Sequence, residues 1–403
     1  MSNIAKTSPI IPKSLIYILA GIVALGPLSV DLYLPAMPSM VFFFDTQFSQ
    51  VQLTLSSYLL GFALFHLVCG PLSDRYGRKS VLLAGLALYV VMSIFCALAD
   101  TIEELILFRF FQAMGACCAP TLGRAIVRDV YPPTESVKAL AYVSSLMAIA
   151  PVIAPTLGGF LLRFGDWRLT FWTLMLAGLI AMLLTFFGVK ESLPEKQTLH
   201  PKNILKNYMS LLTSRVYMGN VLTAACLYAG AFAFLSGASF ILIDYMQVAP
   251  EFFGLYFMVI VVGYVSGNLF TAKMAHKWSA QSILILGLSV AIIPSMAMVA
   301  FCLLQWYYPL LIVTPVLFVT MGIGLVLPQT MGLALKPFAH MAATASAMMG
   351  FLQMMVAAIA GLLVGVFLVD EPLPMALVIL GTGLSALFCY FVILRPVIHE
   401  LED

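Results

Sequence analysis

The chain has 403 residues, of which 62% are hydrophobic and 9% are charged, and its formal net charge is +2. A soluble domain carries about 25% charged residues, so a chain this apolar needs lipid around much of its surface. The small net charge argues against a nucleic-acid-binding surface, which would need a basic stripe.

The hydropathy pattern consists of twelve hydrophobic segments, each about 20 residues long, the length that crosses a bilayer as a helix. They are apolar on every face and about twice as long as the alternating strands of a membrane barrel, so we predict helices. The predicted limits are 15–37, 51–71, 80–98, 105–127, 139–162, 169–189, 217–244, 252–274, 281–304, 308–330, 342–369 and 373–394.

The positive charges predict an orientation. Of the 20 lysines and arginines, only Arg163 and Arg168 fall in loops on one side, and only Arg109 falls in the interior of a span, away from its ends. Loops rich in lysine and arginine stay in the cytoplasm. We therefore expect a multi-pass protein of a bacterial inner membrane with both termini in the cytoplasm, and a bilayer as its constant partner.

Two charged residues lie in the interior of the predicted spans, away from their ends. Asp31 is the only acid there, and Arg109 is the only arginine. A charge at the bilayer centre costs roughly 2.5–3.5 kcal/mol, so such residues are functional candidates. A carboxyl that moves between wet and dry surroundings can bind and release a proton, and Arg109 can pair with it. The alternatives are that Asp31 caps the outer end of the first span and that Arg109 binds backbone carbonyls.

The turn between spans two and three carries a specific pattern of glycine and charge. We expect its two glycines to allow close backbone approach and positive φ. Its acid lies at a helix end beside basic residues, an arrangement that can latch two helical bundles when they meet. The alternative is a basic turn that only sets orientation. The predicted conformational residues are Gly70, Asp74, Arg75, Gly77, Arg78 and Lys79.

Span five contains Pro151 and Pro155, followed by Gly158 and Gly159. Pro155 cannot donate a helical hydrogen bond and should kink the span, while the glycines permit close helix packing. An ordinary kinked helix is the alternative.

The longest polar segment, 190–216, divides the chain into a bundle at 1–189 and a bundle at 217–403. The predicted fold is therefore an all-α polytopic membrane protein with twelve transmembrane helices in two six-helix bundles. Such halves are expected to bind substrate between them near the membrane midplane. A twelve-span protein without internal symmetry is the alternative.

The substrate pocket is expected to be permissive, because the chain has 29 Phe, 16 Tyr and 23 Met, and such side chains repack around different ligands. Plain lipid contact explains many of them equally well. The predicted substrate-binding residues are Tyr58, Phe62, Gln112, Tyr228, Phe232 and Gln353.

Several functions lack any sequence support. The seven cysteines and five histidines have no metal-ligand spacing, and we expect no metal or cofactor. Neither Gly-Lys-Ser nor Gly-Lys-Thr occurs, so ATP-driven transport is excluded. No nucleophile motif suggests an enzyme, and no ring of residues suggests a channel filter. We expect a monomer driven by an ion gradient; Asp31 favours protons, with sodium left open.

The segment from Gly70 to Lys79 resembles the signature loop of the major facilitator superfamily. Arg109 to Gly115 is similar to the family's span-four motif, with Ala113 in the usual glycine position. Ala150 to Gly159 resembles its antiporter motif, with Ala154 replacing a glycine.

The segments Pro27–Pro38 and Ala125–Asp129 resemble the Bcr/CflA branch of bicyclomycin- and chloramphenicol-type drug:proton exporters. This resemblance implies an antiporter for multidrug efflux and antibiotic resistance. It would export small amphipathic molecules in exchange for protons by alternating access. A dedicated metabolite or siderophore exporter of the same fold is the alternative.

Overall fold

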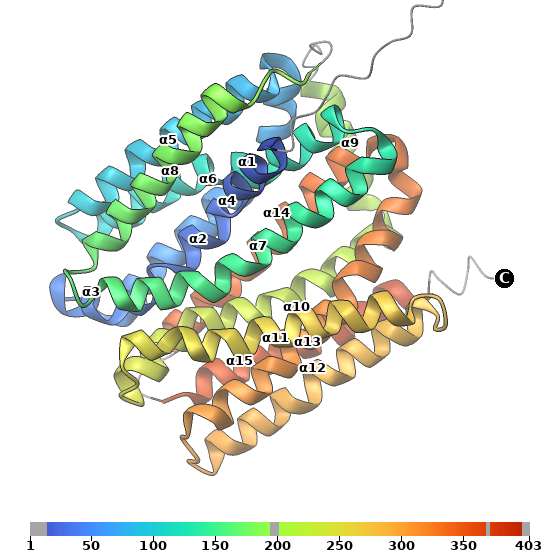
Figure 1. Cartoon of the computed structure of the whole chain (residues 1–403). Helices are drawn as coiled ribbons and strands as arrows, with labels where there is room; N and C mark the ends of the chain where they lie inside the picture. The colour runs from blue at the N-terminus through green and yellow to red at the C-terminus, as the bar shows by residue number, and fades with distance from the viewer. Residues whose placement is uncertain (1–13, 194–200, 368–370, 397–403) are drawn as a thin grey trace, which may run out of the picture.

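The computed structural model describes residues 14–193, 201–367 and 371–396, and these are almost entirely helical (Figure 1). Eleven helical stretches are long and apolar enough to cross a membrane, and a further helix, α7, has a shorter apolar part at Ile149–Leu161. These helices form two groups of six, which confirms the predicted fold of two six-helix bundles.

The N-terminal bundle begins with a first span that is broken into four pieces, followed by five helices. The pieces of the first span are α1 (Ser14–Val23), α2 (Leu25–Asp31), the 3-10 turn η1 (Leu34–Ala36) and α3 (Met37–Phe43). The five helices are α4 (Phe48–Tyr76), α5 (Arg78–Leu98), α6 (Ile102–Val130), α7 (Pro133–Leu161) and α8 (Arg168–Gly188).

The C-terminal bundle contains six spans, of which two end in a π-helical turn and one in a 3-10 turn. They are α10 with η2 (Arg215–Ser239, Phe240–Tyr245), α11 (Pro250–Met274), α12 (Ala280–Leu303), α13 with η3 (Pro309–Leu335, Lys336–Met341), α14 (Ala342–Phe367), and α15 with η4 (Leu373–Phe388, Cys389–Leu394).

The breaks in the first span follow from its prolines. Pro27, Pro35 and Pro38 have no amide hydrogen, so each removes a rung from the helical ladder. The apolar stretch nevertheless runs from Leu15 to Phe43, beyond the predicted limit at residue 37, because α3 continues it. Asp31 therefore lies at a break inside the span rather than close to its end.

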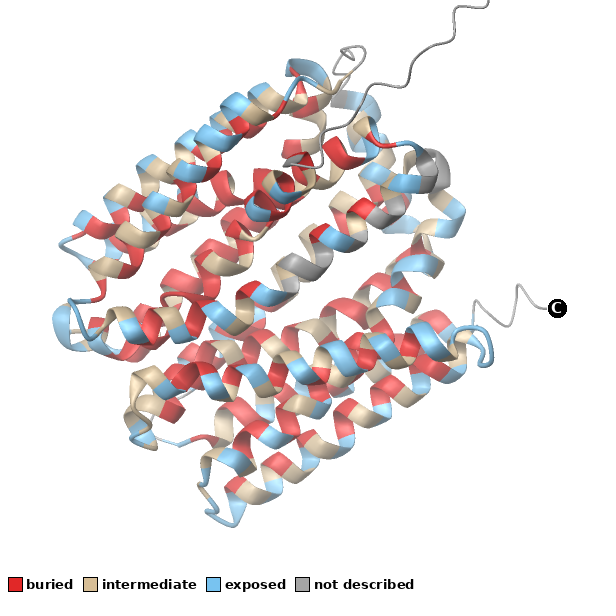
Figure 2. Ribbon diagram, in the orientation of Figure 1, coloured by how far each residue is buried: buried red, intermediate tan, exposed pale blue. Residues whose placement is uncertain are grey.

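The inner and outer faces of the helices differ in how far their side chains are buried. Figure 2 shows buried residues on the faces that the helices turn toward one another and exposed residues on the outer faces. The exposed outer faces carry large apolar side chains such as Phe187, Ile293 and Leu269. This arrangement fits a lipid-facing surface, since no soluble protein of this size exposes so much apolar surface.

The two bundles meet along two helix pairs, α4 with α14 and α7 with α11. At one end of this seam, Gln52 Nε2 donates to the Gly361 carbonyl at 3.5 Å, and the Arg163 guanidinium contacts the Glu251 carboxylate at 2.5 Å. Within the described ranges, Arg163–Glu251 is the only ion pair that joins the halves. The seam is thus closed at the end where span one turns into span two.

The sequence predicted a polar linker loop between the bundles, at 190–216, but the structure shows a helix in this segment. It contains α9 (Pro201–Thr213), which starts at a proline, a residue favoured in the first helical turn. Its buried side lies against α10 and α14, at the end of the molecule opposite α3 (Figure 1).

Candidate functional site

The centre of the N-terminal bundle holds a fully buried arginine. Arg109 of α6 is 0% exposed, and its Nη1 donates to the Ser29 carbonyl at 3.1 Å and to Gln112 Oε1 at 2.7 Å. Its guanidinium lies 4.2 Å from the centre of the Tyr33 ring and 4.3 Å from that of Tyr58. The positive charge is therefore stabilised by two aromatic faces, one main-chain carbonyl and one side-chain amide oxygen rather than by a carboxylate.

The arginine is one end of a polar network that includes Gln112, one turn along α6, and side chains of other spans. Gln112 Nε2 donates to Ser93 Oγ at 2.8 Å. Nearby, the hydroxyls of Ser29 and Tyr89 lie 2.7 Å apart. The residues of this network come from three separate spans, so no local spacing reveals it. The available signal in the sequence was a polar residue inside an otherwise apolar span.

Asp31 lies at the end of α2 and is 3% exposed. Among the residues that the structure covers, it forms no ion pair, so the predicted pairing of Asp31 with Arg109 is absent in this conformation. The 3-10 turn η1, which begins three residues after Asp31, packs against α10, the helix of the other bundle that carries Tyr228. Asp31 thus belongs to the N-terminal bundle but lies near its contact with the other bundle.

The six predicted substrate-binding residues occur in separate groups. On α4, Tyr58 stacks against both Arg109 and Phe62, whose ring lies 6.2 Å away. On α10, the Tyr228 and Phe232 rings are 5.1 Å apart. Gln112 belongs to the arginine network instead, and Gln353 of α14 has a buried Nε2 without a partner among the described residues.

The predicted turn between spans two and three is almost entirely helical. Residues 70–76 form the last turns of α4, α5 starts at Arg78, and Gly77 alone makes the turn with φ of +103°. A side chain at Gly77 would also collide with the Glu191 carboxylate. Gly70 is an ordinary helical residue with nothing near its missing side chain, so the close approach expected there is wrong.

The charges of this turn are satisfied inside the N-terminal bundle. Arg78 contacts Asp74 at 2.6 Å and Asp129 at 3.1 Å, while Glu191 accepts from the Arg78 amide at 2.9 Å. Lys79 Nζ donates to the Phe186 carbonyl at 2.7 Å, and Arg75 lies over the Tyr76 ring. The expected latch to the C-terminal bundle is not formed in this conformation.

The two glycines of span five make close backbone contacts. A methyl group at Gly158 would overlap the Leu32 carbonyl of the first span, and one at Gly159 would overlap the Pro250 carbonyl of α11. The proline positions, Pro151 and Pro155, both lie inside α7. Gly159 therefore belongs to the seam between the bundles, and Gly158 to packing within one bundle.

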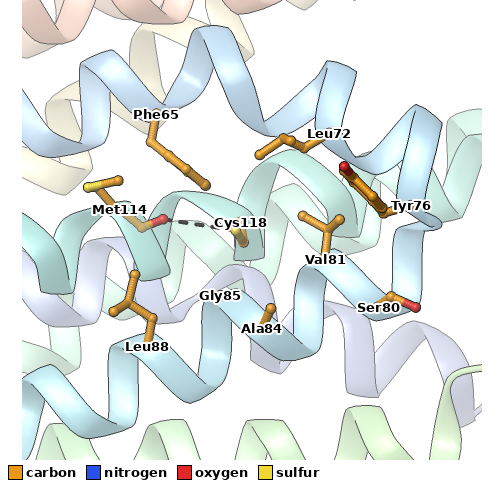
Figure 3. Close-up of a pocket in the computed structure, with 10 residues that line it drawn as sticks. All are labelled: Phe65, Leu72, Tyr76, Ser80, Val81, Ala84, Gly85, Leu88, Met114 and Cys118. Atoms are coloured by element: carbon orange, nitrogen blue, oxygen red, sulfur yellow. Dashed lines mark hydrogen bonds between the residues drawn. The ribbon is translucent and has the colours of Figure 1, made fainter. Parts of the chain in front are cut away.

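A separate groove of about 320 Å³ opens between α4, α5 and α6 (Figure 3). It is apolar, and none of its lining residues belongs to the predicted substrate set. They are Phe65, Leu72, Tyr76, Ser80, Val81, Ala84, Gly85, Leu88, Met114 and Cys118. Across the described part of the chain, no cluster of three or more His, Cys, Asp or Glu side chains could hold a metal ion.

Two six-helix bundles around buried ionisable groups define a polytopic membrane transporter. The sequence profile of the Major Facilitator Superfamily matches residues 19–362, and the chain belongs to this family. Members of this family are transporters rather than enzymes.

The chain is similar to YdgK, an MFS-type transporter of Bacillus subtilis, with 33% identity over 88% of this chain and 89% of the relative. It is 27% identical to a bicyclomycin resistance protein homolog of Haemophilus influenzae over 87% of this chain and 88% of the relative. The multidrug resistance protein MdtL of Escherichia coli O157:H7 matches at 30% identity, over 56% of this chain and 57% of the relative. These relatives are consistent with the Bcr/CflA branch that the motifs suggested.

Solved structures share the fold. A bacterial homolog of the human lysosomal transporter Spinster, in an inward-facing and unoccupied conformation, aligns with a TM-score of 0.73 and 16% identity, covering 96% of this chain and 97% of that one. A D-xylose–proton symporter aligns with a TM-score of 0.72 and 15% identity, covering 94% and 97%.

Proposed function

We propose that this protein exports small amphipathic molecules, including drugs, across a bacterial inner membrane in exchange for protons. The observation that carries the proposal is Asp31, a carboxyl 3% exposed at a helix break inside a span, three residues before a turn that packs against α10 of the other bundle. A group at that place changes surroundings whenever the bundles move relative to each other. Such a carboxyl can take a proton on one side and release it on the other.

The second part of the proposal is a permissive substrate site between the bundles. Tyr58, Phe62, Tyr228 and Phe232 supply aromatic surface, and Gln353 supplies an amide without a partner among the described residues. Such a set binds by shape and apolar contact more than by defined hydrogen bonds, as transport of many compounds requires. The resistance proteins among the relatives support a drug-like substrate class.

The proposed cycle is alternating access between the bundles at 1–189 and 217–403, joined by the segment 190–216. With both termini in the cytoplasm, as the basic loops favour, the closed end of the seam at Arg163–Glu251 faces outward. The conformation described above would then be open toward the cytoplasm, ready to take up substrate there. One chain carries both bundles, so a monomer suffices.

Transport by everted membrane vesicles tests the proposal. A panel of amphipathic drugs, metabolites and siderophores should reveal uptake that an uncoupler abolishes. Uptake that survives the uncoupler but requires sodium would contradict proton coupling. Uptake of a single metabolite or siderophore, with no drug transported, would identify a dedicated exporter instead.

A further inference from the structure

The helix between the bundles, α9, presents four different faces around its circumference. Ile204, Asn207, Tyr208 and Leu211 recur at helical spacing and are the partly or fully buried residues of the helix. The next face around the helix is apolar but exposed: Leu205 is 64%, Met209 53% and Leu212 40% exposed.

The remaining circumference of α9 is polar in a regular order. Lys202 and Lys206 follow directly after the apolar stripe, and Asn203 and Ser210 follow the lysines. Going around the helix, the face that contacts the protein is followed by the apolar stripe, then by the two lysines, and then by neutral polar residues. This order matches a helix that lies in a membrane interface, with its stripe at the acyl boundary and its lysines at headgroup level.

One side-chain hydrogen bond fixes α9 to the N-terminal bundle. The Tyr208 hydroxyl donates to the Leu67 carbonyl of α4 at 2.9 Å. In an unbroken helix this carbonyl would accept from residue 71, but Pro71 has no amide hydrogen to give. Leu211 packs with Tyr217 and Met348 of the C-terminal bundle, so α9 contacts both halves.

We propose that α9 is a docking surface for the anionic phospholipids of the adjoining leaflet, held in place by the hydrogen bond from Tyr208 to the carbonyl that Pro71 leaves free. Leu205, Met209 and Leu212 enter the acyl boundary, and Lys202 and Lys206 bind anionic headgroups. The occupant follows from charge complementarity: the stripe is flanked by two cations, and the described part of α9 carries no acid. This inference does not depend on the transported substrate or the coupling ion.

Spin labels on the full-length protein in vesicles test the surface. A label at Leu205→Cys should be more accessible to oxygen than to a water-soluble nickel chelate, and a label at Ser210→Cys on the polar face should show the reverse. Adding phosphatidylglycerol to phosphatidylcholine vesicles should deepen the 205 label. Replacing both lysines, as Lys202→Gln with Lys206→Gln, should weaken this response to phosphatidylglycerol, because each lysine near an anionic surface contributes a factor of about five in affinity.

The matched control is Lys273→Gln with Lys277→Gln, which removes the same charge from the last turn of α11 and the turn that follows it, and should leave the response unchanged. Tyr208→Phe should increase the mobility of the 205 label, because the ring remains but its hydrogen bond is lost. Equal water access at sites 205 and 210 would overturn the proposal. So would a lysine variant that responds to phosphatidylglycerol like the control, or a Tyr208→Phe label with unchanged mobility.

Discussion

Arg109 shows how this bundle holds a buried charge without a carboxylate. Its planar group fits between the rings of Tyr33 and Tyr58, and a single nitrogen makes both hydrogen bonds, to Ser29 and Gln112. A lysine could not replace it, because an ammonium has neither the flat faces nor the fork of donors. The site therefore selects arginine by shape as well as by charge.

At Tyr58, the contributions of the ring and of the hydroxyl to stability can be measured separately. The hydroxyl has no hydrogen-bond partner among the described residues, whereas the ring faces Arg109. Tyr58→Phe should therefore keep stability and transport, while Tyr58→Leu should cost about 1–2 kcal/mol through the lost cation–π contact. Thermal unfolding in detergent and vesicle transport measure both. Equal destabilisation by the two variants would mean that the ring face is unimportant.

Asp31 is the residue on which proton coupling depends. Asp31→Asn keeps the shape of the side chain but cannot carry a proton on and off, so uphill export should fall to background while the protein still reaches the membrane. The control is Asp45→Asn, the same chemical change at an exposed turn. The measurement is drug accumulation in everted vesicles under an imposed pH gradient. Normal uphill export by a well-expressed Asp31→Asn variant would remove Asp31 from the mechanism.

At the scale of elements, α7 and α11 close the seam through main-chain contact. Gly159→Ala would push a methyl group into the Pro250 carbonyl, so the variant should favour separation at this end. A cysteine at Ser239, which is buried beside Met37, should then react faster with an impermeant maleimide added outside. Gly165→Ala is the control, because its methyl group would meet Leu169 no closer than 3.6 Å. Equal labelling of the two variants would contradict the tight seam.

The short turn between α4 and α5 offers a second comparison within one motif. Arg78→Ala removes the contacts to Asp74 and Asp129 and should cost about 1–2 kcal/mol of local stability, slowing transport. Arg75→Ala removes an equal charge that is exposed, lies over the Tyr76 ring and forms no ion pair with the described residues, so it should change little. Transport rates and cysteine accessibility of both variants decide the matter. If the two behave alike, the motif acts only through its positive charge.

At the scale of the whole molecule, the Arg163–Glu251 pair is a minor contributor to closure. The Arg163 side chain is 57% exposed, and exposed pairs contribute about 0–1 kcal/mol. Arg163→Gln should therefore shift the open fraction at this end by less than about fivefold, and added salt should reproduce the shift in the parent. Spin-label distances across the seam measure it. A larger shift that salt does not mimic would show that the pair acts as a true lock.

The sequence predicted most of the fold because each span is marked by its own apolar run, and the family motifs placed Gly77 and Gly159 correctly at a turn and a contact. It failed where partners come from distant spans. Nothing local couples Ser93 to Gln112 or aims Arg109 away from Asp31. The helix α9 was missed for a different reason: Lys202 and Lys206 made its segment look like a polar loop and hid the apolar stripe beside them.

The glycine contact between α7 and α11 also bears on how quickly the protein can switch. When an interface of interlocking long side chains separates, those side chains must change rotamers, and they lose conformational entropy again when the interface re-forms. Where Gly159 meets the Pro250 carbonyl, there is no side chain on one face to free or freeze. Separation at this contact requires little rearrangement of side chains. The free-energy barrier between the closed and open states therefore stays low, even though the two helices pack tightly.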